Sequence, residues 1–191
     1  MKLETARLLL KPPAEEDVDA ITAVASDWRV AEMTLVPHPY GADDARAWIQ
    51  RAGSNWQEHG MGGFAVFTRH GLAFIGGIGI RPTAIPGHAS TGYWFCPSIW
   101  GRGFATEALR EIIRFGFEEK KLERIEAEHL LINPSSGRVM EKAGMDHATH
   151  VDLEERDGNG LVPGIRRYIH AGEWRASQVA ERPHASLTRT A

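Results

Sequence analysis

Hydrophobic residues recur at helical spacing in two segments of the N-terminal third of the chain. Apolar side chains between Val18 and Ala25 fall on one face, and the proline and three acidic residues before them suit the start of a helix. A longer apolar stripe, made of alanine, tryptophan and isoleucine, predicts a helix over Ala42–His59. Gly60 follows this stripe and is expected to end the helix.

Several shorter segments are rich in β-branched and aromatic residues, which favours strands. Prolines end the first of these segments, and a turn around Gly71 separates the next two. Three consecutive segments in the middle of the chain predict an antiparallel meander. The strands expected are Arg7–Lys11, Gly63–Thr68, Leu72–Ile80, Ser90–Cys96 and Arg124–Ile132.

Helical spacing returns twice in the C-terminal half of the chain. Apolar side chains from Ala105 to Gly116 predict a second long helix. Pro134–Ala143 is expected to form a short helix, because Asn133 can act as its N-cap and Gly144 can stop it.

The C-terminal segments predict a hairpin and then a tail. Residues 147–155 and 161–171 are separated by Asp-Gly and Asn-Gly pairs within residues 156–160, and such pairs favour tight hairpin turns. Few large apolar residues occur near the C-terminus. We therefore expect one domain over residues 1–176 and a flexible tail over residues 177–191.

Composition and charge narrow the classes of function. The 191 residues suffice for one domain with a sizeable core, and a hydrophobic content of 42% is typical of a globular protein. The net charge of −3 argues against sequence-independent binding of nucleic acid. The apolar stretches are too short for a signal peptide or a membrane span, and the single Cys96 excludes an internal disulfide. We therefore expect a soluble cytoplasmic protein with no nucleic-acid or membrane partner.

The segment "WGRGFATEAL" (Trp100–Leu109) leads from an aromatic strand into the second long helix. A helix N-terminus leaves backbone N–H groups free and carries a partial positive charge, so it can hold a phosphate. Gly101 and Gly103 let the backbone come close to such an anion. Neither a Walker loop nor a dinucleotide fingerprint fits, because Phe104 follows the second glycine and Thr106 stands where a small residue is needed.

Two motifs resemble those of a known family. "WGRGFA" is similar to the cofactor loop Gln/Arg-x-x-Gly-x-Gly/Ala of the GCN5-related N-acetyltransferases (GNAT), with Trp100 in the first place. "NPSSGRVMEKAGM" (Asn133–Met145) resembles the Asn-x-x-Ser-x-Arg-x-x-Glu-Lys-x-Gly element of the branch that contains the ribosomal-protein N-terminal acetyltransferases, the RimJ/RimL-like branch. The resemblance implies an α+β fold, in which a twisted, mixed, mostly antiparallel sheet has a V-shaped splay between its fourth and fifth strands and helices on both faces.

The same resemblance implies acetyl-CoA as the acetyl donor and no metal. The pyrophosphate would rest on the loop N–H groups, and the pantetheine would pair with backbone groups of the splayed strand. Cys96 is expected to act only through its backbone, as an oxyanion donor, because nothing local activates its thiol. The cofactor-binding residues implied are Phe95, Cys96, Gly101, Arg102, Gly103, Phe104, Ala105, Thr106, Asn133, Ser136 and Arg138.

The sequence does not identify one residue as the general base. Many members of the resembled branch carry a glutamate at the position of Ser90. Glu126, Glu128, His88, His38 and a proton relay through water remain as alternatives, with Glu128 as the candidate base. A site without a strong base suits an amine of low pKa, such as an α-amine.

The sequence does not identify the general acid either. Many GNAT enzymes have a tyrosine at the position of Met140, and a thioether cannot donate a proton. Ser136 is the best substitute, although its hydroxyl could equally serve as a helix cap. Asn133 could cap the helix and also reach an amide of the cofactor.

The acceptor side is the least determined by the sequence. By resemblance, His38, Tyr40, Ser90 and Tyr168 would frame the entrance for a small-molecule amine or a protein N-terminus. We therefore expect an acetyl-CoA-dependent N-acetyltransferase that acts as a monomer or homodimer. The alternative is a non-catalytic protein of the same fold that binds or senses acyl-CoA, which Ser90 and Met140 favour.

Overall fold

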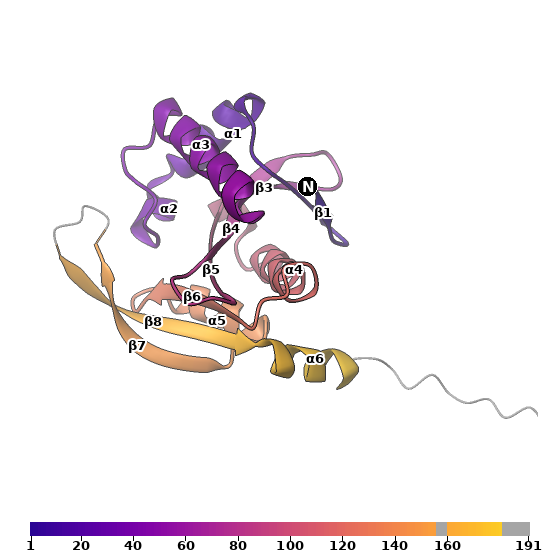
Figure 1. Ribbon diagram of the computed structural model, residues 1–191. Coiled ribbons are helices and arrows are strands. Elements are labelled where there is room, and N and C mark those ends of the chain that lie inside the picture. The colour runs from indigo at the N-terminus through magenta and orange to yellow at the C-terminus, as the bar shows by residue number, and fades with distance from the viewer. Residues whose placement is uncertain (156–159, 181–191) are drawn as a thin grey trace, which may run out of the picture.

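A mixed eight-stranded sheet lies at the centre of the molecule, with the strand order β1-β2-β3-β4-β5-β6-β8-β7 (Figure 1). The computed structural model describes residues 1–155 and 160–180. Neighbouring strands are antiparallel except β5 and β6, which are parallel. The strands are β1 (Leu3–Glu4), β2 (Leu8–Lys11), β3 (Gly63–Thr68), β4 (Phe74–Pro82), β5 (His88–Phe95), β6 (Arg124–Leu130), β7 (His147–Glu154) and β8 (Leu161–His170).

Helices cover both faces of this sheet (Figure 1). The first and third helices pack over β3 and β4, whereas the fourth and fifth pack over the opposite face. None of the helices in the described ranges combines the length and apolar character needed to cross a membrane. The helices are α1 (Val18–Ala25), α2 (Trp28–Glu32), α3 (Ala42–His59), α4 (Phe104–Glu118), α5 (Pro134–Lys142) and α6 (Ala171–Ala180), with short 3-10 turns η1 (Glu15–Asp17) and η2 (Pro97–Ile99).

The predicted fold class is confirmed, and so are the predicted meander, long helices and closing hairpin. The pattern of hydrophobic residues did not predict β1, α2 or α6. Strand β1 and helix α2 are too short to show a period, and helix α6 has no clear apolar face. Helix α6 runs through Ala180, so residues 177–180 of the expected tail are helical. The remaining tail, 181–191, and most of the predicted hairpin turn, 156–159, lie outside the described residues.

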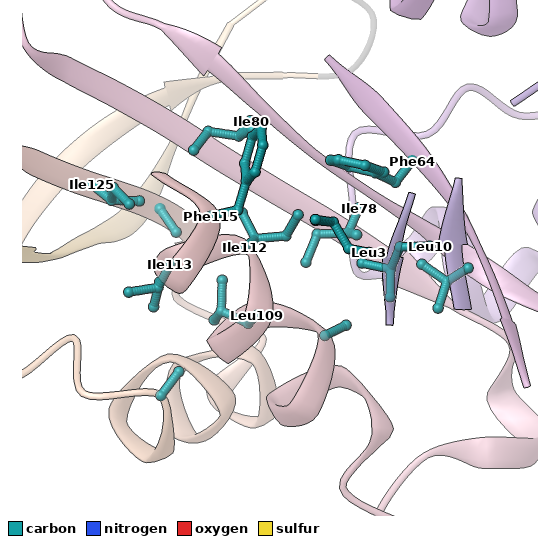
Figure 2. Close-up of a cluster of buried hydrophobic side chains, with 14 of the residues drawn as sticks. Leu3, Leu10, Phe64, Ile78, Ile80, Leu109, Ile112, Ile113, Phe115 and Ile125 are labelled. Atoms are coloured by element: carbon teal, nitrogen blue, oxygen red, sulfur yellow. The ribbon is translucent and has the colours of Figure 1, made fainter. Parts of the chain in front are cut away.

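The main hydrophobic core lies between α4 and the sheet (Figure 2). Leu109, Ile112 and Ile113 of α4 are fully buried against isoleucines of β4 and β6. Phe64 and Phe115 meet edge to face with ring centroids 6.0 Å apart. Since burying each such side chain contributes about 1.5–3 kcal/mol, this layer fixes α4, and therefore the loop before it, to the sheet.

The sheet opens between β5 and β6. These strands pair from His88 opposite Arg124 to Thr91 opposite Ala127, and the pairing stops there. Strand β5 continues beside β4 as far as Phe95. This is the predicted V-shaped splay, between the fourth and fifth of the strands expected from the sequence.

Gly76 holds β4 in a conformation that a side chain would disturb. Its φ is +155°, and an added Cβ would lie 2.3 Å from the carbonyl oxygen of Trp94. We expect Gly76→Ala to lower the free energy of unfolding by at least about 2 kcal/mol, through backbone strain and overlap. Gly92→Ala on the next strand is the matched control, because a Cβ there meets no atom within 4 Å. Urea unfolding should show it within about 0.5 kcal/mol of wild type, and equal losses in both variants would contradict this account.

Candidate active site

A single cleft of about 1550 Å³ includes both edges of the gap between β5 and β6. Side chains alternate along β5, so successive residues face opposite sides of the sheet. Trp94 contacts Trp48 of α3, with ring centroids 5.8 Å apart, whereas Tyr93 contacts Ser136 of α5. We call the two parts of the cleft its α3 side and its α5 side.

The predicted anion loop lies on the α5 side, where α4 begins. Gly101 and Gly103 have φ values of +73° and +80°, which glycine adopts readily. The first hydrogen bond within the helix runs from Glu107 N–H to the Gly103 carbonyl (3.0 Å). The three preceding N–H groups of the helix therefore have no intrahelical acceptor. The predicted residues of this loop that line the cleft are Gly101, Gly103, Phe104, Ala105 and Thr106.

An arginine from the N-terminal segment braces this loop. Arg7 donates through Nη1 to the Arg102 carbonyl (3.0 Å) and through Nε to Glu107 Oε2 (2.6 Å). Its guanidinium carbon also lies 4.3 Å from the centre of the Phe104 ring. Thr5 donates its hydroxyl to the other Glu107 oxygen (2.6 Å). Sequence reasoning missed this brace, because about a hundred residues separate its two halves and no local motif links them.

Several cations surround the loop. Arg138, predicted as a cofactor-binding residue, lines the cleft and donates to Ser135 Oγ (2.8 Å). Arg110 and Lys142, which sequence reasoning missed, also line it. The guanidinium of Arg102 lies 5.4 Å from the Phe104 ring centre, and Arg102 is not among the described residues that line the cleft.

The backbone of Cys96 is not available as predicted. Its N–H donates to the Ile75 carbonyl of the neighbouring strand at 2.8 Å. Because backbone groups alternate in direction along an antiparallel pair, the polar groups of Tyr93 and Phe95 point away from β4, toward the gap. The Phe95 carbonyl accepts the indole N–H of Trp100 (2.8 Å), which leaves the Phe95 N–H as the backbone donor nearest the loop.

Asn133 caps α5 as predicted, and its second contact is with protein. Its Oδ1 accepts the Ser136 N–H (3.1 Å), and its Nδ2 donates to the Met33 carbonyl (3.0 Å) at the end of α2. Both polar ends of the side chain are therefore engaged, and an amide of a cofactor is not needed to satisfy them. The second bond fixes the segment after α2 to the start of α5.

Ser136 does not use its hydroxyl as a cap. The hydroxyl oxygen lies 2.8 Å from Tyr93 Oη, and the Tyr93 hydroxyl also lies within donating distance of the Ser136 carbonyl (3.1 Å). Both residues line the cleft. Burial raises the pKa of Tyr93, although the hydrogen bond with Ser136 opposes this shift, so the phenol keeps its proton at neutral pH. Sequence reasoning missed Tyr93, because nothing in its local pattern shows a partner 43 residues away.

The candidate base lies on the α3 side. Ser90 pairs with Glu126 across the parallel strands, so Glu126 and Glu128 share the face of Ser90. Glu128 lines the cleft and accepts two hydrogen bonds from Arg166, at 2.7 and 2.9 Å, through the same oxygen. Glu126 pairs with Arg124 (2.8 Å) and more distantly with Arg166 (3.6 Å), and it lies outside the cleft that the described residues form.

Two predicted acceptor residues are placed elsewhere. His38 packs edge-on against Trp28, with centroids 4.9 Å apart. Tyr168 lies between the Arg124 guanidinium (3.8 Å) and the His147 ring (4.6 Å). Neither lines the cleft formed by the described residues, whereas Ser90 and Tyr40 do.

The anion loop, the open strand pair and the short capped helix together match a known family. Residues 7–146 match the family described as the acetyltransferase (GNAT) domain. The chain belongs to the GNAT acetyltransferases. It is therefore an acyltransferase by family, and the fold confirms the resemblance that the two motifs indicated.

Several proteins with assigned names or solved structures are similar to this acetyltransferase. The FsC-acetyl coenzyme A-N(2)-transacetylase of Aspergillus fumigatus is 29% identical over 185 residues, which cover 90% of this chain and 77% of that protein. A GNAT-family acetyltransferase structure from Bacillus anthracis has a TM-score of 0.78 at 25% identity, covering 90% of this chain and 99% of that one. A ribosomal-protein α-N-acetyltransferase solved with coenzyme A shares the fold, with a TM-score of 0.73 at 15% identity and coverage of 89% and 98%.

The brace of the acetyltransferase's loop should depend on pH through Glu107. Burial raises the pKa of this carboxyl, but hydrogen bonds from Thr5 and from the backbone and side chain of Arg7 outweigh it and hold the pKa below its usual 4.5. Ionised Glu107 therefore stabilises the fold above about pH 4.5, and this contribution is lost as the pH falls through its folded pKa.

We expect Glu107→Gln to be less stable than wild type at pH 7 and the difference to shrink as the pH falls toward about 3. Urea unfolding at several pH values measures this difference. Glu32→Gln is the control, because Glu32 is exposed on α2. A difference for Glu107→Gln that stays constant with pH would show that the carboxylate charge does not contribute.

Proposed function

We propose that this enzyme transfers the acetyl group of acetyl-CoA directly to a primary amine, either a small-molecule amine or the α-amine of a protein N-terminus. The observation that carries the proposal is the division of the cleft. An anion-binding loop and a hydroxyl pair lie on its α5 side, and a carboxylate lies on its α3 side. Donor and acceptor can therefore approach the gap in the sheet from opposite faces.

The α5 side fits a ligand with several phosphates. The free N–H groups at the start of α4 are the donors that a pyrophosphate needs, and the partial charge of the helix favours an anion there. A Cβ added at Gly101 would meet no atom within 4 Å, so the loop leaves open space beside its backbone. Arg110, Arg138 and Lys142 supply positive charge around the same space.

Acetyl-CoA, when bound, supplies its acetyl group as an activated thioester. The Phe95 N–H points into the gap, and we assign the role of oxyanion donor to it and not to Cys96. Ser136 holds a hydroxyl proton on the α5 side, and Glu128 Oε2, on the α3 side, accepts no hydrogen bond from a described residue. A proton can thus be accepted from the amine on one face and supplied on the other.

Glu128 suits an acceptor that needs little deprotonation. A lysine side chain, with a pKa of about 10.4, costs roughly 4–5 kcal/mol to deprotonate at pH 7, whereas an α-amine near 8 costs only about 1–1.5 kcal/mol. A carboxylate is a weak base compared with either amine. The site therefore favours an α-amine over a lysine side chain.

Two similar proteins are named for acetyl transfer to nitrogen. The Aspergillus fumigatus relative is named FsC-acetyl coenzyme A-N(2)-transacetylase, and the neighbour solved with coenzyme A is named a ribosomal L7/L12 alpha-N-protein acetyltransferase. The second supports the fold only, because its identity is 15%. Both small amines and peptides therefore belong in a substrate panel.

The panel measures free thiol released from acetyl-CoA in the presence of each amine. It should contain small α-amines, peptides with a free N-terminus, and the same peptides with that amine blocked and a lysine retained. Peptides with an acidic second residue should be included, because Arg51 and Arg81 line the cleft and form no ion pair with a described residue. Release with free α-amines but not with blocked peptides supports the proposal. Tight binding of coenzyme A with no amine-dependent release would instead favour the acyl-CoA sensor.

The loop glycines give a prediction for donor binding. Gly101→Ala places a methyl group in the space assigned to the phosphates, at a φ of +73° that costs about 1–2 kcal/mol for a side chain. We expect a KM for acetyl-CoA at least tenfold higher. Gly71→Ala is the matched control, since Gly71 has a φ of +86° and equally open surroundings but lies in the β3–β4 turn. It should lose similar stability and keep its KM, and equal effects on KM would contradict the assigned site.

The two strand glutamates give a prediction for the base. Because only Glu128 lines the cleft, Glu128→Gln should lower kcat for an α-amine about tenfold or more at pH 7, while Glu126→Gln has a smaller effect. The loss in Glu128→Gln should decrease at higher pH, where more of the amine is already neutral. Steady-state kinetics over pH 6.5–9.5 tests this, and a larger effect of Glu126→Gln would move the base to that residue.

A further inference from the structure

We propose that Tyr93 is the positioning residue for Ser136, and that its phenol stabilises the Ser136 oxygen while that oxygen gives up its proton on the α5 side of the cleft. This inference rests on the proposed function and deepens it, because it assigns a role to a side chain that no motif pointed to. Tyr93 touches no reacting atom in this scheme and acts only through Ser136.

The hydrogen-bond geometry limits how the two hydroxyls can be arranged. Tyr93 Oη is 2.8 Å from Ser136 Oγ and 3.1 Å from the Ser136 carbonyl, which can only accept. If the phenol hydrogen points to the carbonyl, the serine hydrogen is drawn toward Tyr93. If it points to Oγ, the serine hydrogen is released toward the cleft. A rotation of one O–H group therefore switches Ser136 between a held proton and a proton that it can donate.

The phenol is suited to stabilise charge rather than to supply the proton itself. Burial raises the pKa of Tyr93, so its own ionisation in this site is unfavourable. A hydrogen bond from a neutral hydroxyl to a developing alkoxide is shorter and about twice as strong as one between neutral groups. Tyr93 can therefore strengthen its bond to Ser136 just when Oγ becomes negative, and it keeps its own proton.

Three contacts hold Ser136 in place for this role. Asn133 accepts the Ser136 N–H at the helix N-terminus. The next residue, Gly137, lies so close to the buried His129 ring that a Cβ there would be 2.8 Å from His129 Nε2. Tyr93 is fixed by β5. The short helix is thus held against both strands that border the gap, and the serine has little freedom to turn away.

The other nearby candidate on α5 cannot take this role. Met140 is only 1% exposed, lies in the main core, and its thioether has no proton to donate. The hydroxyl that contacts Ser136 therefore comes from Tyr93 on β5 and not from a residue of α5.

The proton balance of the transfer closes with these groups. The neutral amine nitrogen forms a bond to the acetyl carbon and loses one proton, and the carbon–sulfur bond breaks with its electron pair going to sulfur. Ser136 gives its hydroxyl proton to that sulfur and regains one from solvent, which has received the amine proton through Glu128. One proton passes in total from nitrogen to sulfur, and Tyr93 neither gains nor loses one.

A double-mutant cycle on the full-length enzyme tests the inference, using the best acceptor from the panel. Tyr93→Phe keeps the ring and removes only the hydroxyl. We expect Ser136→Ala to lower kcat about 100-fold, within the range known for general acid catalysis, and Tyr93→Phe to lower it about tenfold. The double variant should match Ser136→Ala within about twofold, because Tyr93 has nothing to act on once Ser136 is gone.

Further measurements separate this role from a structural one. The KM for acetyl-CoA and the midpoint of thermal unfolding should stay close to wild type in Tyr93→Phe, and Ser136→Thr, which restores a hydroxyl, should regain part of the kcat lost in Ser136→Ala. The inference would be overturned if the loss of kcat in the double variant equalled the product of the two single losses. It would also be overturned if Tyr93→Phe changed KM or stability instead of kcat. Full activity of Ser136→Ala would overturn it as well. Failure of the proposed function is distinct, since the wild-type enzyme would then release no thiol with any acceptor.

Discussion

Strands β5 and β6 pair over only four residue positions, and the cleft exists because the sheet stays open beyond them. An interrupted parallel pair leaves backbone N–H and C=O groups without a strand partner, which is costly if they are buried. Part of this demand is met within the protein, since the Trp100 indole donates to the Phe95 carbonyl. The same opening connects the two faces of the sheet, so that donor and acceptor groups can meet there.

Contacts between distant segments keep the opening in a fixed shape. Arg7 and Glu107 tie the anion loop to the first strands, and the α4 core behind the loop fixes the direction of the helix. On the other side, Asn133 links the segment after α2 to the start of α5. These contacts join the walls of the cleft to one another and to the sheet, and so hold the loop amides and the Ser136 hydroxyl in fixed positions. Such preorganisation is a large part of what an acyltransferase needs.

The sequence located some site residues and misplaced others for identifiable reasons. The sequence predicts the positions of Gly101 and Gly103 in an anion-binding loop, because glycines directly before a helix N-terminus are recognisable over a few residues. The Cys96 N–H was assigned to the gap, but strand alternation turns it toward Ile75. His38 and Tyr168 do not line the cleft formed by the described residues, because His38 packs edge-on against Trp28 and Tyr168 packs against His147 and the Arg124 guanidinium. A segment's place in the sequence did not determine which way its side chains point.

Local patterns by themselves determined the main helices, the meander and the anion loop, because apolar spacing, caps and glycines act over a few residues. They also identified the family, through two motifs. Only the tertiary structure decided which groups meet across the gap. Tyr93 and Ser136 lie 43 residues apart in the chain, and their hydroxyl groups contact each other. The alternation of side chains along β5 and β6 places Glu128 on the opposite face of the sheet. Register and packing set these pairings, and neither leaves a signature in the neighbouring residues of the chain.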